Sequence, residues 1–221
     1  MTRPDDLLAS QNSGGPVGGS PTKIRALAAL AQRVRSCRRC PGLNIAGETE
    51  SAPGYGSPDS PVVIVGQSLC GPCMKSQIPF TGGSGKLIDQ ALTAAGLRKN
   101  EIFITNVVHC HPPDNRPSLP QEVSNCSKFL SAELETVRPQ LIIGLGKDAA
   151  QWLKEWARPH ASHWTPNTPA PKVSDAPLLM LVHHPAYIRR RPAEERDRYI
   201  QQLTHALQWA FLARSEPRNK P

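Results

Sequence analysis

Six cysteines are the residues of this chain whose type and spacing most directly indicate chemistry. Cys37 and Cys40 are two residues apart, which lets two thiolates reach one metal centre, and Cys110 and Cys126 follow farther along the chain. Four thiolates together can hold an iron–sulfur cluster or a zinc ion. The alternative is that all four are buried and inert, and that the close pair is accidental.

Cys70 and Cys73 form a second pair with the same spacing. Taken alone, this is the spacing of a thiol–disulfide redox pair. Redox pairs of that type normally open a helix, and the sequence from Pro72 to Ser76 does not clearly predict one. We therefore predict that four cysteines serve a metal site and two lie in a loop, with thiol redox chemistry as a further hypothesis.

Length and charge narrow the class of protein. The 221 residues are enough for one sizeable domain and scarcely enough for two. Lys and Arg number 26 against 18 Asp and Glu, and the resulting net charge of +8 favours an anionic partner such as nucleic acid. No apolar run approaches the roughly 20 residues of a membrane span, and no secretion signal opens the chain. We expect a monomeric, cytoplasmic protein without membrane contact.

An alternation of apolar strands and amphipathic helices follows an N-terminal segment rich in Gly, Ser and Pro. Residues 1–22 are predicted to be a disordered tail and residues 23–215 one domain. The runs that predict strands are residues 62–66, 102–108, 141–144 and 178–182. The segments that predict helices are residues 23–37, 86–95, 121–137, 147–156 and 194–212.

Short apolar strands between helices predict the α/β class: a single three-layer domain whose central, mostly parallel, four-stranded sheet has helices on both faces. In such sheets ligands bind at the carboxyl ends of the strands. Polar groups occur at three of the four predicted ends, in residues 66–68, 106–108 and 183–185. This edge of the sheet is the predicted site.

Five motifs in sequence order resemble the uracil-DNA glycosylase superfamily, most closely its iron–sulfur branch, family 4. The resemblance runs from about Val34 to Arg191. Its motifs are Cys37-x-x-Cys40-Pro41, Pro79-Phe80-Thr81-Gly82 with Ser84–Ile88, Thr105–Val108, Cys110–Pro113 with Cys126, and His184–Tyr187. The resemblance implies that Cys37, Cys40, Cys110 and Cys126 hold a structural 4Fe-4S cluster. It also implies excision of uracil, or a related deaminated base, from DNA.

The resemblance assigns roles to three side chains at the strand ends. Phe80 would stack on a base extruded from the duplex. Asn106 offers a donor and an acceptor, which can read the edge of uracil that differs from cytosine. His184 would donate a hydrogen bond to the base as the N-glycosidic bond breaks, and a neutral imidazole suffices for this. Without the motif, Phe80 would be read as core packing and Asn106 as a capping residue.

The segment after His184 would contact DNA. In the resembling family this loop enters the minor groove, where an apolar wedge fills the gap left by the flipped base. Tyr187 or Ile188 is the predicted wedge, and Arg189 and Arg190 are predicted to bind phosphates. The alternative is a solvated basic turn before the last helix.

The first strand end departs from the family pattern. Gln67 follows Gly66 where the iron–sulfur branch has a glutamate, and Ser68 stands where the best-known branch has an aspartate. The nearest acids in the sequence, Asp59 and Asp89, lie outside this loop. Gln67 can position water but cannot act as a base.

Three residues of this strand end receive predicted roles from the alignment of motifs. Gly66 and Ser68 are predicted to contact the substrate. Cys70 replaces a glycine near C5 of the pyrimidine and is predicted to screen against the methyl group of thymine. Because an amide occurs at the Gln67 position in some branches, we predict a monofunctional DNA glycosylase acting on uracil-containing DNA near the nucleoid. The alternative is a DNA-binding protein with little or no glycosylase activity.

Overall fold

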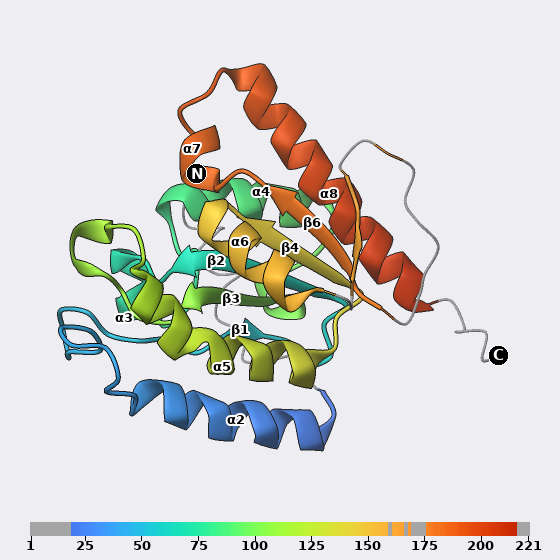
Figure 1. The fold of residues 1–221 in the computed structure, drawn as a ribbon. Helices are drawn as coiled ribbons and strands as arrows, with labels where there is room; N and C mark the ends of the chain where they lie inside the picture. Colours follow the sequence, from blue (N-terminus) through green and yellow to red (C-terminus); the bar gives the residue numbers. More distant parts are fainter. Residues whose placement is uncertain (1–18, 159–160, 166–167, 169–175, 216–221) are drawn as a thin grey trace, which may run out of the picture.

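The computed structural model describes residues 19–158, 161–165, 168 and 176–215. Its sheet has the strand order β1-β3-β2-β4-β6-β5 (Figure 1). The four predicted strands are all present and run parallel: β2 (Val62–Ser68), β3 (Phe103–Val108), β4 (Leu141–Leu145) and β6 (Leu178–Val182). The predicted α/β architecture with a mostly parallel sheet is therefore confirmed.

The sheet has two edge strands more than the predicted four. β1 (Tyr55–Gly56) pairs antiparallel with β3, and β5 (Ser162–His163) pairs parallel with β6. Each is only two residues long, and two residues cannot display an apolar run or an alternation. Both lie outside the ranges that the sequence predicted as strands or helices.

The helices match the predicted ones apart from their ends and two short additions. They are α2 (Pro21–Arg35), α3 (Gly71–Ser76), α4 (Lys86–Ala94), α5 (Pro120–Val137), α6 (Lys147–Trp156), α7 (Pro185–Ile188) and α8 (Ala193–Ser215). Short 3-10 helices are η1 (Gly83–Gly85), η2 (Lys99–Glu101) and η3 (Pro113–Asn115). Within the described part of the chain, no helix is long and apolar enough to cross a membrane.

Two predictions about local structure are corrected. Pro21 begins α2, so residues 21–22 belong to a helix rather than to the predicted tail; residues 1–18 of that tail lie outside the described residues. Residues 71–76 form the helix α3, although the sequence did not clearly predict one. In both helices a proline occupies the first turn, where its missing N–H costs no hydrogen bond.

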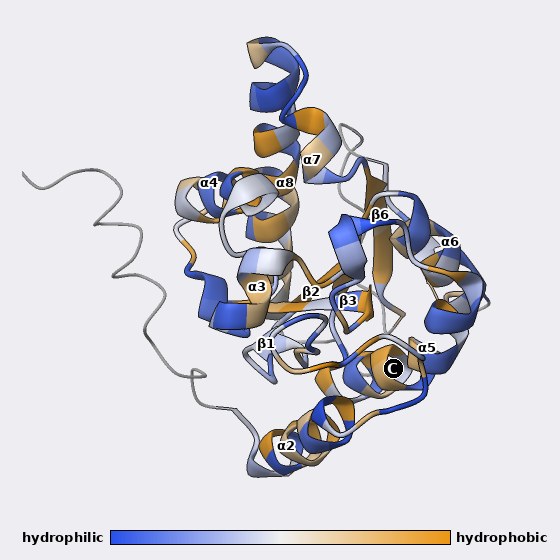
Figure 2. Cartoon of the chain, turned by 90° about the vertical axis from the view of Figure 1, so that its left-hand side faces the viewer, coloured by the Kyte–Doolittle hydropathy of each residue, from blue (hydrophilic) through white to orange (hydrophobic). Residues whose placement is uncertain are grey.

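Helices cover both faces of the sheet (Figure 1). Alternate strand residues enter two cores: Ile64 and Ile143 pack with α4 and α8, whereas Val63 and Ile142 pack with α2, α5 and α6. The strands are accordingly apolar along their length, and the polar colours lie mainly on the surrounding helices and loops (Figure 2). Burial on both faces fixes the register of the parallel strands.

The strand register brings the predicted functional residues to one edge. Gly66 of β2 is paired with Asn106 of β3. On the other side of β2, Gly146 follows β4 and donates its backbone N–H to the carbonyl of Val182, the last residue of β6, at 2.9 Å. The ends of β2, β3, β4 and β6 therefore lie side by side, and His184 follows β6 directly.

We expect substitution of one central core side chain to test this packing. Ile143 is 0% exposed, so Ile143→Ala should lower the free energy of unfolding by about 3 kcal/mol through lost burial and a residual cavity. Urea unfolding followed by circular dichroism measures the change. Ile24 on α2 is 41% exposed, and Ile24→Ala is the control that should change stability by less than about 0.5 kcal/mol. Equal effects of the two substitutions would contradict the described core.

Candidate active site

A close approach of three residues forms the centre of the strand-end site. A Cβ atom added to Gly66 would lie 2.4 Å from Asn106 Oδ1 and 2.5 Å from Phe80 Cζ. Both distances are far shorter than van der Waals contact, so only glycine lets the amide of Asn106 and the ring of Phe80 reach this position. The structure thus brings together three residues that the sequence placed in separate motifs.

Asn106 presents an incompletely bonded amide at this point. Asn106 is 2% exposed, and its side-chain Oδ1 has no hydrogen-bond partner among the described residues. Buried polar atoms are normally paired, because an unpaired one retains the full cost of losing water. An acceptor left free beside Phe80 and Gly66 is therefore suited to a ligand that brings its own donor.

Phe80 is held in a strained conformation by groups outside its motif. Its φ is 57°, in the left-handed region that non-glycine residues rarely adopt. Its carbonyl accepts a hydrogen bond at 3.1 Å from Nζ of Lys99, which is 4% exposed and also pairs with Asp89 at 2.7 Å. The sequence analysis missed Lys99, because a single lysine in a short turn carries no motif.

His184 faces the same centre from the end of β6. Its ring centroid lies 5.9 Å from that of Phe80, at an interplanar angle of 36°. Its Nδ1 accepts a hydrogen bond from the backbone N–H of Ala186 at 3.2 Å, so the neutral ring carries its proton on Nε2. Burial lowers the pKa of His184 and favours this neutral form, although Asp148 opposes the shift.

Asp148, in the first turn of α6, is a carboxylate near the site that the sequence analysis missed. Its negative charge acts on His184, and its Oδ2 is buried without a hydrogen-bond partner among the described residues. The acids nearest in sequence are engaged elsewhere: Asp59 pairs with Lys23 at 3.0 Å and Asp89 with Lys99. The position of Asp148 directly after the third predicted strand was the signal that could have found it.

Gln67 and Ser68 occupy the end of β2 as predicted. Both are half-buried, and the side chain of Gln67 makes no hydrogen bond to another described residue. Cys70 is the N-cap residue of α3 and forms a disulfide with Cys73, while the other four cysteines are free. The structure therefore separates the cysteines into the four and the two that the spacing predicted.

The segment after His184 offers one exposed aromatic and two arginines whose side chains have no ion-pair partner in the described part of the chain. Tyr187 is 43% exposed, whereas Ile188 is 5% exposed and packs in the core, so burial removes Ile188 as a wedge and leaves Tyr187. Arg189 and Arg190 are exposed. Arg191 is engaged by Glu195 at 2.9 Å and lies over the Tyr187 ring.

Comparison with known proteins decides the family. The model of the uracil DNA glycosylase superfamily matches residues 53–208. The chain belongs to this superfamily. The predicted resemblance is confirmed, and with it, at the level of the family, the prediction of a DNA glycosylase.

The relatives found in this superfamily are of type 4 and type 5, and type 4 is represented most often among them. A type-4 uracil-DNA glycosylase of Archaeoglobus fulgidus is 36% identical over 124 residues, 56% of this chain and 61% of that protein. Another, from Thermotoga maritima, is 29% identical over 186 residues, 81% of this chain and 91% of the relative. A type-5 uracil-DNA glycosylase of Thermus thermophilus is 26% identical over 155 residues, 57% of this chain and 70% of the relative.

The four free cysteines of this superfamily member line one cavity together with His109 and Phe129. Burial, followed by the neighbouring sulfurs, raises the pKa of the Cys110 thiol to about 12. Within the described residues, no three His, Cys, Asp or Glu side chains are grouped so as to hold one metal ion. A four-iron cluster places its thiolates on different irons, so its ligands surround the cavity instead of converging on one point.

A buried ion pair lies between this cavity and the sheet. His109 and Glu133, each 2% exposed in their side chains, approach within 3.2 Å. Burial alone would lower the pKa of His109, but Glu133 and Cys126 raise it to about 10. Glu133 also accepts hydrogen bonds from Thr105, next to Asn106, and from the backbone N–H of Gly54. The pair therefore links α5 to the strand that carries Asn106.

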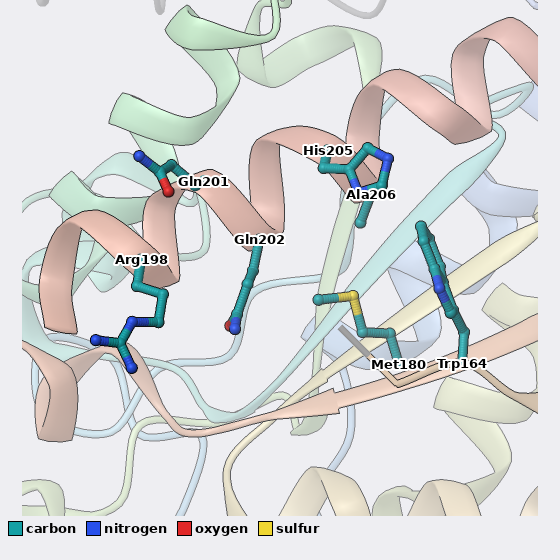
Figure 3. A pocket seen from close by; sticks show the side chains of 7 residues that line it. All are labelled: Trp164, Met180, Arg198, Gln201, Gln202, His205 and Ala206. Atoms are coloured by element: carbon teal, nitrogen blue, oxygen red, sulfur yellow. The ribbon is translucent and has the colours of Figure 1, made fainter. Parts of the chain in front are cut away.

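A cavity of about 210 Å³ lies away from the strand-end residues, between α8 and the β5–β6 edge (Figure 3). Its lining residues are Trp164, Met180, Arg198, Gln201, Gln202, His205 and Ala206. None of them belongs to a superfamily motif that the sequence carries. The candidate active site therefore rests on the motif residues at the strand ends and not on this cavity.

The electrostatic role of Asp148 gives a prediction that does not depend on activity. The pKa of His184 should lie below its ordinary value of 6.5 because of burial. Asp148 favours the charged imidazolium, so Asp148→Asn should lower this pKa further. Ring ¹⁵N chemical shifts measured against pH give both values, and Asp197→Asn on the exposed face of α8 is the matched control. An unchanged or higher pKa in Asp148→Asn would contradict the assignment.

Proposed function

We propose that this protein is a monofunctional DNA glycosylase that hydrolyses the N-glycosidic bond of uracil, or of a related deaminated base, in DNA. The observation that carries the proposal is the buried Asn106 amide, whose Oδ1 has no partner among the described residues and lies with the Phe80 ring over Gly66, while His184 lies beside that ring. The type-4 names of the relatives support the same substrate. The chain would act on DNA in the cytoplasm, associated with the nucleoid, as a monomer.

Base recognition follows from Phe80 and Asn106. A base rotated out of the helix stacks on an aromatic ring, and such stacking contributes about 1–3 kcal/mol per base. The free Oδ1 of Asn106 accepts from N3–H of uracil, and its amide group donates to O4. Cytosine presents an acceptor and a donor in the opposite places, so the same amide disfavours it. Cys70 and Ser68 lie toward the C5 side of the base, where Cys70 excludes the methyl group of thymine.

His184 and Gln67 serve bond cleavage. As the bond from C1′ to nitrogen breaks, negative charge develops on the base, and the Nε2–H of His184 donates to its O2. Gln67 holds a water molecule by hydrogen bonds, and this water adds to C1′ of the sugar. Among the described residues, the lysines nearest to Phe80 in the sequence are poorly placed as amine nucleophiles: Lys75 and Lys86 are exposed to solvent, and the amine of Lys99 is paired with Asp89. This arrangement favours hydrolysis without a covalent intermediate.

DNA binding would use the segment after His184. Tyr187 is the exposed side chain that can enter the gap left by the extruded base. Arg189 and Arg190 neutralise phosphates, in agreement with the net charge of +8.

A second candidate function is DNA binding with little or no excision. The observation that favours it is the end of β2, where Gln67 stands in place of a carboxylate. General base catalysis contributes about 10²–10⁴-fold to rates, so its loss can leave a slow enzyme or a binding protein.

A single-turnover assay separates the two functions. Cluster-loaded protein should release uracil from single- or double-stranded oligonucleotides, and Gln67→Glu should accelerate release by about 10- to 100-fold, because a carboxylate can accept the proton of the attacking water. Gln208→Glu, on the exposed face of α8, adds the same charge away from the site and is the matched control.

The DNA-binding function predicts a different result in the same assay. If the protein retards DNA but leaves uracil, hypoxanthine and xanthine in place, the glycosylase proposal fails and the binding function stands. Strong activity in Gln67→Glu alone would then locate the defect at this residue.

We also propose that Cys37, Cys40, Cys110 and Cys126 hold a 4Fe-4S cluster. The donor set fits, because four free thiols line one cavity and their mutual repulsion as thiolates calls for a cation. Such a cluster would tie the loop after α2 to α5, and four protein ligands leave no open position for substrate. Its role is therefore structural.

The cluster has a visible test. The purified protein should be brown, contain iron and sulfide, and lose colour and stability in Cys126→Ala. Cys73→Ala removes a cysteine of the other pair and should keep the colour. A colourless protein that contains zinc would contradict the iron–sulfur assignment.

A further inference from the structure

The disulfide between Cys70 and Cys73 lies inside the segment that follows β2 and carries Phe80. We call residues 69–82 the β2–η1 segment; it contains α3. We infer that this disulfide is a thiol–disulfide exchange site for dithiol reductants, and that its redox state sets the conformation of the β2–η1 segment. The effect on base excision rests on the proposed function, whereas the exchange chemistry does not.

The bond is poorly explained as a staple of the fold. Its two cysteines are three positions apart, and closing so short a loop restrains the unfolded chain little. The two large cores, on either face of the sheet, do not contain it. Where DNA lies inside a cell, thiols are kept reduced, and disulfides that form there are usually transient or redox-sensing.

The two sulfurs differ in access. Cys70 is half-buried at the start of α3, whereas Cys73 is 1% exposed and packs with Ala52 and Leu69. An external thiolate can therefore reach the sulfur of Cys70, and the sulfur of Cys73 is positioned to be the leaving group. In the reverse reaction the Cys73 thiol is positioned to attack the mixed disulfide at Cys70. One accessible and one buried sulfur is the arrangement that exchange requires.

The exchange step balances with a dithiol as the electron donor. One thiolate of the reductant attacks the sulfur of Cys70; the bond to Cys73 breaks, and its electron pair goes to the Cys73 sulfur, which takes up a proton. The second thiol of the reductant then attacks the reductant sulfur that is bonded to Cys70, and Cys70 is released as a thiol. The protein gains two electrons and two protons, and the dithiol becomes a disulfide.

Opening the bond would loosen one end of α3. This helix has only six residues, too few to be stable by itself. At its last residue, the hydroxyl of Ser76 donates to Oγ1 of Thr81 at 2.9 Å, so α3 is attached to the residue that follows Phe80. The disulfide is the covalent restraint at the other end. Its reduction should therefore change the position of Phe80 as well as that of Cys70.

The exchange is tested by alkylation and mass spectrometry of the native, cluster-loaded protein in dithiothreitol buffers of increasing reducing strength. We expect Cys70 and Cys73 to become alkylated together, and to re-form the bond in oxidised buffer while the cluster absorption stays constant. Hydrogen exchange at the α3 amides should be about tenfold faster after reduction. Uracil excision should show about tenfold lower kcat/KM, because Phe80 is less well placed.

Cys73→Ala cannot form the bond and should behave as the reduced protein in every buffer. A disulfide that opens only after denaturation, or thiols that stay free in oxidised buffer, would overturn the exchange site. Equal hydrogen exchange and equal kcat/KM in both states would overturn the coupling to the β2–η1 segment. If neither state excises uracil, the proposed function fails, while alkylation and hydrogen exchange still decide this inference.

Discussion

The close approach of Asn106 and Phe80 over Gly66 is the constraint on which the rest of the site depends. It needs β2 and β3 in the observed parallel register, since a shift by one residue would turn Asn106 to the opposite face of the sheet. That register is fixed far from the site, by apolar side chains that alternate between two cores. The packing of the two cores thereby determines how closely Asn106 and Phe80 approach each other at the site.

Two side chains near the site carry exceptions to ordinary polar pairing. Most buried polar atoms in proteins are hydrogen-bonded, yet Asn106 Oδ1 and Asp148 Oδ2 are buried without partners among the described residues. Phe80 adds a strained backbone angle, held by the buried amine of Lys99. Unpaired atoms and strain persist only where the surrounding structure enforces them, and Phe80, Asn106 and Asp148 are held in this way by the elements around them.

The structural elements and site residues that could be predicted from the sequence are those marked by apolar runs, helical periods or motifs. Four buried strands and the long helices were found because a continuous apolar run or a helical period survives in one dimension. β1, β5 and α3 were missed or misread because two to six residues hold no period. Lys99 reaches Phe80 only through folding, and no spacing in the sequence records that approach. Asp148 lies shortly after the third predicted strand, so its position near the strand ends could have been found, but it belongs to no motif. Ile188 fits the motif of a wedge, but packing against the core buries it.

The free energy lost because Gln67 replaces a carboxylate can be compared with the contributions of His184 and Phe80. General base catalysis of 10²–10⁴-fold corresponds to about 3–5 kcal/mol of barrier. In the proposed mechanism a positioned donor such as His184 would contribute about 3–4 kcal/mol, and stacking on Phe80 would supply about 1–3 kcal/mol toward holding the base. When the nucleobase leaves before water adds, the hydrogen-bond donor acts on bond cleavage, which is the demanding step. The general base acts on the addition of water, which is the easier step. In the proposed mechanism the loss at Gln67 therefore falls on the step with more tolerance, whereas Asn106 and His184 would serve base recognition and bond cleavage.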